Sequence, residues 1–166
     1  MIELADIEAA RARIAGSAIR TPLVRLHGEG APAEIYLKCE NLQPVNSFKI
    51  RGAANAIMLA PGTACAKGLV TASAGNMAQG IAWMARVLGV PATIVVPDHA
   101  PQAKLAAIER LGGRVLKIPY DDWWNAIVTG HVDGGGGTVR APRPGPGRDG
   151  GQRHDRAGDP GGPARP

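Results

Sequence analysis

One stretch of the sequence alternates three apolar runs with two segments of helical periodicity, and this alternation constrains the fold most strongly. The runs are residues 68–73 and 92–96, which are mostly apolar, and residues 114–118, in which Val115, Leu116 and Ile118 stand beside two charged residues. Between them, residues 77–88 and 101–111 place apolar side chains three or four positions apart, as on one face of a helix. Strand, helix, strand, helix, strand at this spacing requires parallel strands joined by right-handed crossovers. The sequence therefore predicts an α/β fold, an open parallel sheet with helices on both faces.

Weaker patterns outside this stretch predict four more elements. They are a helix over residues 4–14, a short strand at 35–38, a helix from Lys49 to Leu59 and a last helix at 121–128. In the first helix, Asp6 is the expected amino-terminal cap, and Ile7, Ala10 and Ile14 share one face. In the last helix, the expected apolar contacts are made by Trp123, Trp124 and Ile127.

The composition changes abruptly at His131. Residues 131–166 comprise 36 residues, of which 11 are Gly, 6 Pro and 6 Arg, and they include no Leu, Ile, Met, Phe, Tyr, Trp or Lys. Such a segment buries too little apolar area to offset a chain entropy of about 1–2 kcal/mol per residue. We expect this tail to be disordered, and a shifted reading frame explains its composition most simply.

Composition also argues against several classes of protein. No apolar run reaches the length of a membrane span and no secretory signal opens the chain, so a cytoplasmic protein is expected. Residues 1–130 carry 13 basic and 10 acidic side chains, and the net charge of +5 is raised by the tail, so nucleic-acid binding is not expected. The four histidines are scattered, and Cys39 and Cys65 have no metal-ligand spacing, so no metal site is predicted.

Lys49 is the first candidate for chemistry. It follows Phe48 and stands where a helix is expected to begin. The positive end of the helix dipole disfavours a second positive charge there, which helps the amine to act as a nucleophile toward an aldehyde. Taken alone, a lysine at this place is more often a solvated surface residue.

The second candidate is the loop from Ser73 to Met77, which joins the first strand of the parallel sheet to its helix. Ligands of open α/β sheets bind at the carboxyl ends of the strands, and free backbone N–H groups at a helix start bind anions. A carboxylate or a phosphate would fit. The alternative is purely structural, with Ser73 or Asn76 capping the helix and Gly75 making the turn.

Taken together, the two motifs resemble a known family. Ser47-Phe48-Lys49-Ile50-Arg51-Gly52-Ala53 combined with Ser73-Ala74-Gly75-Asn76-Met77-Ala78-Gln79-Gly80 is similar to the fold-type II pyridoxal-phosphate enzymes, and most closely to the threonine/serine ammonia-lyases (dehydratases). The upstream segments Arg20-Thr21-Pro22-Leu23 and Leu37-Lys38-Cys39-Glu40-Asn41-Leu42-Gln43-Pro44 also look like that family. The resemblance covers residues 18–128.

The resemblance implies roles for individual residues. Lys49 would hold pyridoxal 5'-phosphate covalently and take the proton from the substrate Cα, with Phe48 near the cofactor ring and Asn76 bonded to the ring oxygen. The loop Ser73, Ala74, Gly75, Asn76 and Met77 would hold the carboxylate of a small amino acid, L-threonine or L-serine. The products would be a 2-keto acid and ammonia.

Two residues depart from the family pattern. The family usually has histidine at the position of Met77, a change that leaves the backbone donors of the loop in place. Related racemases carry a hydroxyl at the position of Ala74, so its absence favours elimination over racemisation. Another fold-type II activity, such as serine racemisation, hydroxyaspartate elimination or β-replacement, is the first alternative.

The resemblance also suggests a domain organisation. Residues 1–52 are expected to belong to the family's large domain, residues 53–130 to an incomplete small α/β domain and residues 131–166 to the tail. Gly134-Gly135-Gly136-Gly137 resembles the family's phosphate loop in composition but not in context. Family members are longer and typically homo-oligomeric. We therefore expect impaired turnover by this chain, and a non-catalytic truncated fragment is the second alternative.

Overall fold

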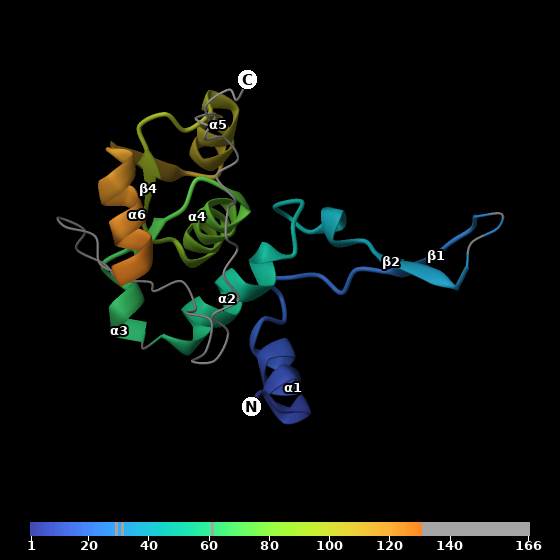
Figure 1. The fold of residues 1–166 in the computed structure, drawn as a ribbon. Coiled ribbons are helices and arrows are strands. Elements are labelled where there is room, and N and C mark those ends of the chain that lie inside the picture. The colour runs from blue at the N-terminus through green and yellow to red at the C-terminus, as the bar shows by residue number, and fades with distance from the viewer. Residues whose placement is uncertain (29, 31, 61, 131–166) are drawn as a thin grey trace, which may run out of the picture.

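The computed structural model describes residues 1–28, 30, 32–60 and 62–130, and the expectations for residues 131–166 lie outside this part of the chain. Twelve elements follow one another (Figure 1). In chain order they are α1 (Leu4–Arg13), β1 (Leu23–Leu26), β2 (Ile35–Lys38), the 3-10 helix η1 (Glu40–Leu42), α2 (Lys49–Leu59), α3 (Gly62–Cys65), β3 (Leu69–Ala72), α4 (Asn76–Leu88), β4 (Ala92–Pro97), α5 (Gln102–Arg110), β5 (Gly113–Ile118) and α6 (Tyr120–Thr129).

The strands β3, β4 and β5 form a parallel sheet in that order, as the alternation predicts. In the register of the sheet, Ala92 lies opposite Leu69 on one side and Gly113 on the other. The helices α4 and α5 cover one face and α6 lies on the other (Figure 1), and α2 packs on α4 as a further layer. The α/β class and the parallel topology are therefore confirmed.

The hydrophobic core lies between this sheet and the helices α2, α4 and α5. β4 is its most deeply buried strand, because Ile94, Val95 and Val96 have no exposed surface. Met84 of α4 and Ile50 of α2 are equally inaccessible. Burial of β4 on both faces explains why this strand is a continuous apolar run rather than an alternating one.

The strands β1 and β2 form a separate antiparallel hairpin, which stands away from the parallel sheet (Figure 1). The strand at residues 35–38 is as predicted, whereas β1 is not among the predicted elements. All eight hairpin residues are exposed. No helix covers either face of the hairpin within the described part of the chain, so its leucines and valine gain little from burial.

Two predictions about the terminal helices are wrong in detail. α1 is capped by Glu3, and Asp6 is the third helical residue, whose carboxylate accepts the Glu3 N–H at 2.9 Å. Ile7 on the expected apolar face is 58% exposed. In α6, Trp124 and Ile127 are exposed while Ala126 is buried. The face of α6 that packs on the sheet is therefore narrower than the one predicted from its apolar residues.

The described helices are short. None of those in residues 1–28, 32–60 and 62–130 is both long and apolar enough to cross a membrane. The same residues contain no cluster of three or more His, Cys, Asp and Glu side chains that could hold a metal ion. Cys39 and Cys65 are free and half-buried.

Candidate active site

Lys49 is the first residue of α2, and Phe48 occupies the position before it. The Nζ atom of Lys49 lies 4.7 Å from the centre of the Phe48 ring, a cation–π distance. Phe48 is 57% exposed and Lys49 is half-buried. No carboxylate pairs with the Lys49 amine among the described residues. The amine is therefore accessible and free to react.

A polar cluster anchors the helix that carries Lys49. Arg51 donates from Nε to Glu40 Oε2 at 2.8 Å and from a terminal nitrogen to Glu40 Oε1 at 2.7 Å, and Thr21 donates to the same carboxylate. The Arg51 hydrogen bonds, helped by the bond from Thr21 and opposed by desolvation, lower the pKa of Glu40 to about 2. This bidentate pair holds the first turn of α2 against η1.

Gln43 completes the cluster from the other end of η1. Its side chain is 2% exposed, accepts the Ile19 N–H at 3.0 Å and donates to the Ile19 carbonyl at 2.9 Å. Arg51 donates to the same carbonyl at 3.0 Å. The segment before β1, the turn after β2 and the start of α2 are thus joined by hydrogen bonds, most of them partly buried, and these bonds hold the first turn of α2, which carries Lys49.

The second candidate motif lies at the carboxyl end of β3. Ser73 donates its N–H to Val95 of β4 at 3.1 Å, and its Oγ accepts the Gly75 N–H at 3.3 Å. Gly75 is the residue before α4, and no side chain caps this helix. The capping that the structural alternative assigns to Ser73 or Asn76 is therefore wrong, whereas Gly75 does stand at the turn before the helix. The N–H groups of the first turn remain available to an anion.

Ser47 brings the two motifs together. Its Oγ accepts the backbone N–H of Lys49 at 3.3 Å and the side-chain amide of Asn76 at 3.2 Å, and the residue is 6% exposed. The lysine and the loop therefore belong to one site, although they are 24 residues or more apart in sequence. Ser47 is part of the lysine motif, but its role was not predicted, because hydrogen bonding to Asn76 depends on how α2 packs on α4.

The packing of α2 on α4 depends on a glycine. A methyl group at Gly80 would lie 3.1 Å from the Cβ of Ala53 and 3.5 Å from the carbonyl oxygen of Lys49. The two helices therefore approach closely just where the site is built. Met77 and Ala74, the two departures from the family pattern, both pack against the hydrophobic core.

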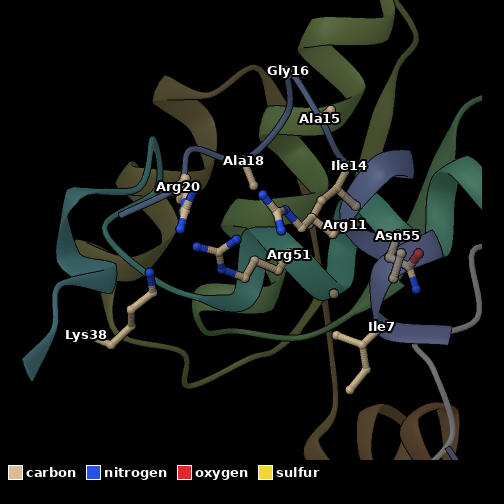
Figure 2. A pocket seen from close by; sticks show the side chains of 12 residues that line it. Ile7, Arg11, Ile14, Ala15, Gly16, Ala18, Arg20, Lys38, Arg51 and Asn55 are labelled. Atoms are coloured by element: carbon tan, nitrogen blue, oxygen red, sulfur yellow. The ribbon is translucent and has the colours of Figure 1, made fainter. Parts of the chain in front are cut away.

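A cavity of about 740 Å³ lies between α1 and α2 (Figure 2). Its charged side chains are those of Arg11, Arg20, Lys38 and Arg51. Lys49 and the loop from Ser73 to Met77 do not line it, but Gly52 of the lysine motif does, and a methyl group at Gly52 would lie 3.9 Å from the Cε atom of Met77. The cavity is therefore lined by other residues than the candidate catalytic ones, although it adjoins them.

Aromatic residues follow the carboxyl ends of β4 and β5. The His99 ring lies 5.5 Å from that of Tyr120, which lies 5.8 Å from Trp123. Asp98 accepts hydrogen bonds from the ring and the backbone of His99, and these bonds lower the pKa of the Asp98 carboxyl. Trp123 donates from Nε1 to the Val95 carbonyl at 3.1 Å. The sequence marks Trp123 only as an apolar contact, so this polar role is new.

Comparison with known proteins identifies the family. A model of the family described as pyridoxal-phosphate dependent enzyme matches residues 14–133. The chain belongs to this family. It is 44% identical over 119 residues to the L-threonine dehydratase catabolic TdcB of Staphylococcus aureus (strain USA300), a match that covers 70% of this chain and 34% of that protein.

Solved structures of other members of this pyridoxal-phosphate dependent family have the same fold. The threonine deaminase from T.th. superposes with a TM-score of 0.67 at 35% identity, over 75% of this chain and 40% of that one. The serine racemase of Dictyostelium discoideum superposes with a TM-score of 0.66 at 40% identity, over 72% of this chain and 39% of that one. The fold-type II prediction is confirmed. The chain spans about a third of the length of the curated relatives it matches.

The donor set fits the family's cofactor. Pyridoxal phosphate bonds through its aldehyde to a primary amine and carries a ring oxygen that accepts hydrogen bonds. The Lys49 amine is free of carboxylate partners within the described residues, and the Asn76 amide uses one bond to Ser47, which leaves a second N–H. The glycine run at residues 134–137, which resembles the family's phosphate loop in composition but not in context, lies outside the described part of the chain.

Proposed function

We propose that this chain carries the cofactor lysine and the substrate loop of an ammonia-lyase that converts L-threonine or L-serine into a 2-keto acid and ammonia. The observation that carries the proposal is the shared bonding of Ser47 to the Lys49 backbone and the Asn76 amide. Through Ser47, the backbone of Lys49 and the loop residue Asn76 are bonded to the same oxygen atom, which supports assigning the lysine and the loop to one site. The similarity to the L-threonine dehydratase of Staphylococcus aureus and to the threonine deaminase from T.th. supports the choice of reaction.

Each residue of the site then has a task. Pyridoxal phosphate, when bound, supplies an aldehyde for amines and a ring that delocalises the charge left on the substrate Cα. Lys49 would hold the cofactor through Nζ, and the same atom would accept the Cα proton. Asn76 would donate to the ring oxygen, and Phe48, which is 57% exposed, would pack near the cofactor ring. The backbone N–H groups of Ala74, Asn76 and Met77 would bind the substrate carboxylate, because those of Ser73 and Gly75 are already bonded to Val95 and to Ser73 Oγ.

The residues around the loop favour elimination over racemisation. Racemisation requires a second acid that delivers a proton to the face of Cα opposite the lysine. Ala74 has no ionisable group and packs against the core, so it cannot serve. Loss of the β-hydroxyl is then the productive outcome. Racemisation of serine is the second candidate activity because the chain superposes on the serine racemase of Dictyostelium discoideum.

The proposal is tested by mapping the cofactor. The full chain is incubated with pyridoxal phosphate, reduced with borohydride and digested, and the modified lysine is located by mass spectrometry. We expect the label on Lys49 and not on the exposed Lys38, and we expect Lys49→Arg to remove it. A label distributed equally over the surface lysines would contradict the proposal.

Products formed from L-threonine, L-serine and D-serine separate the candidate reactions. Formation of a 2-keto acid and ammonia supports elimination, and interconversion of the serine enantiomers supports racemisation. If Lys49 is labelled but no product forms, the chain is a cofactor-binding part of the enzyme rather than the whole catalyst.

A further inference from the structure

The carbonyl oxygen of Val95 accepts two hydrogen bonds from different parts of the chain. The Ser73 N–H reaches it at 3.1 Å and the Trp123 indole N–H at 3.1 Å. A carbonyl oxygen has two lone pairs, so it can keep both bonds at once. Val95 has no exposed surface, so water competes weakly with either donor. The first residue of the loop and the first turn of α6 are therefore attached to the same atom.

A short series of hydrogen bonds leads from this carbonyl to the start of α4. Ser73 is held through its N–H, and its Oγ then accepts the Gly75 N–H at 3.3 Å. Gly75 immediately precedes Asn76, the first residue of the uncapped helix α4. The direction in which the N–H groups of Asn76 and Met77 point therefore depends on how firmly Ser73 is held.

The indole of Trp123 is itself well placed. It is half-buried, and its ring lies 5.8 Å from Tyr120, which in turn lies 5.5 Å from His99 beyond the end of β4. Its neighbour Trp124 is 53% exposed and makes no hydrogen bond to a described residue. Of the two tryptophans, only Trp123 connects α6 to the strand that supports the loop.

We propose that Trp123 is a positioning residue for the substrate loop, acting through the Val95 carbonyl that it shares with Ser73. The inference rests on the proposed function in one respect, namely that this loop binds the substrate carboxylate. The hydrogen-bond geometry stands without it. Trp123 touches neither the substrate nor the cofactor; it limits the motion of Ser73 and so keeps the loop N–H groups directed at the carboxylate.

The first test measures amide hydrogen exchange by NMR on the full chain. Trp123→Phe removes the indole N–H and keeps an aromatic ring, Trp123→His restores a ring N–H, and Trp124→Phe is the matched control. Because a hydrogen bond of this kind contributes about 1 kcal/mol, we expect Trp123→Phe to speed exchange at Ser73 about five-fold, with Ile94 of the same sheet unchanged. Trp123→His and Trp124→Phe should stay within about two-fold of the original chain.

Three results would overturn the inference: unchanged exchange at Ser73 in Trp123→Phe, equal acceleration at Ser73 and Ile94, or identical behaviour of the phenylalanine and histidine variants. The last two would mean that Trp123 contributes bulk to the fold rather than a hydrogen bond to the loop. If the phenylalanine variant does not fold, the histidine variant decides: near-normal protection of Ser73 supports the inference, and its loss contradicts it.

The second test titrates L-threonine and follows the amide signals of residues 73–77. We expect Trp123→Phe to weaken binding by up to about five-fold and Trp124→Phe to leave it unchanged, because only the former loosens the loop. Normal binding by Trp123→Phe would overturn the inference. If L-threonine does not bind the original chain at all, the proposed function loses its substrate, whereas the exchange test still decides the role of Trp123.

Discussion

The parallel sheet and the β1–β2 hairpin are both built from apolar strands, yet they differ in what stabilises them. In β4, Ile94, Val95 and Val96 are completely buried between helices. In the hairpin, Leu23 is 62% exposed and Leu37 is 47% exposed. The hairpin is joined to the rest of the molecule at its base, where Thr21 and Arg51 both donate hydrogen bonds to Glu40. Apolar composition alone therefore does not determine burial; a covering layer does.

The candidate active site lies between the parallel sheet and the base of the hairpin. The sheet presents the Ser73–Met77 loop at a rigid edge, and the polar cluster at the base of the hairpin fixes the start of α2. Lys49 lies at the point where these two regions meet. Its position therefore depends on hydrophobic packing from one side and on charged hydrogen bonds from the other.

The largest effect is expected in the sheet. Ile94→Ala removes a fully buried side chain from the central strand and should lower the free energy of unfolding by about 3 kcal/mol, from lost burial and the cavity left behind. Urea unfolding followed by circular dichroism measures this change. A loss below about 1 kcal/mol would mean that β4 is not the central support of the core.

The next effect should arise at the base of the hairpin. Glu40→Gln removes the charge that Arg51 and Thr21 share, and we expect a loss of about 2 kcal/mol, since hydrogen bonds to charged groups contribute more than neutral ones. The matched control is Glu34→Gln. The Glu34 side chain is more than half exposed, so its ion pair with Arg25 should contribute less than about 0.5 kcal/mol to the free energy of unfolding. Equal losses in both variants would refute this distinction.

The same carboxylate makes the stability depend on pH. The pKa of Glu40 is about 2 in the folded chain against an ordinary value of 4.5, chiefly because Arg51 hydrogen-bonds to the ionised form. As the pH falls, Glu40 therefore takes up a proton at a higher pH in the unfolded chain than in the folded one. Its contribution to the free energy of unfolding is present above pH 4.5 and is lost as the pH falls toward 2. The urea midpoint should drop over this window, and it should drop less in Glu40→Gln. Parallel slopes would exclude Glu40 as the cause.

The smallest effect is expected on the hairpin itself. Leu37→Ala shortens an apolar side chain that is already 47% exposed, so the free energy of unfolding should change by less than about 0.5 kcal/mol. The same urea measurement applies. A cost comparable with that of Ile94→Ala would show that the hairpin is covered in solution and would remove the contrast between the two regions.

Much of the fold could be predicted because local periodicity is sufficient for it. The runs at β3 and β4 are mostly apolar, and β5 has three aliphatic residues beside Arg114 and Lys117. The helices between them repeat every three to four residues, and only parallel pairing is compatible with such connections. The start of α2 at Lys49 was likewise predictable. The predictions failed where one sequence pattern is compatible with two structures. Asp6, for example, belongs to a residue type that often caps helices, but it lies inside α1.

The sequence by itself therefore determined the parallel α/β unit, the place of Lys49 at a helix start and the loop from Ser73 to Met77. Only the tertiary structure decided that Ser47 joins the lysine to Asn76 and that Trp123 shares a carbonyl with Ser73. The reason is physical. Periodicity is a property of neighbours along the chain, whereas these hydrogen bonds join side chains nearly 30 residues from their partners and exist only after the helices have packed.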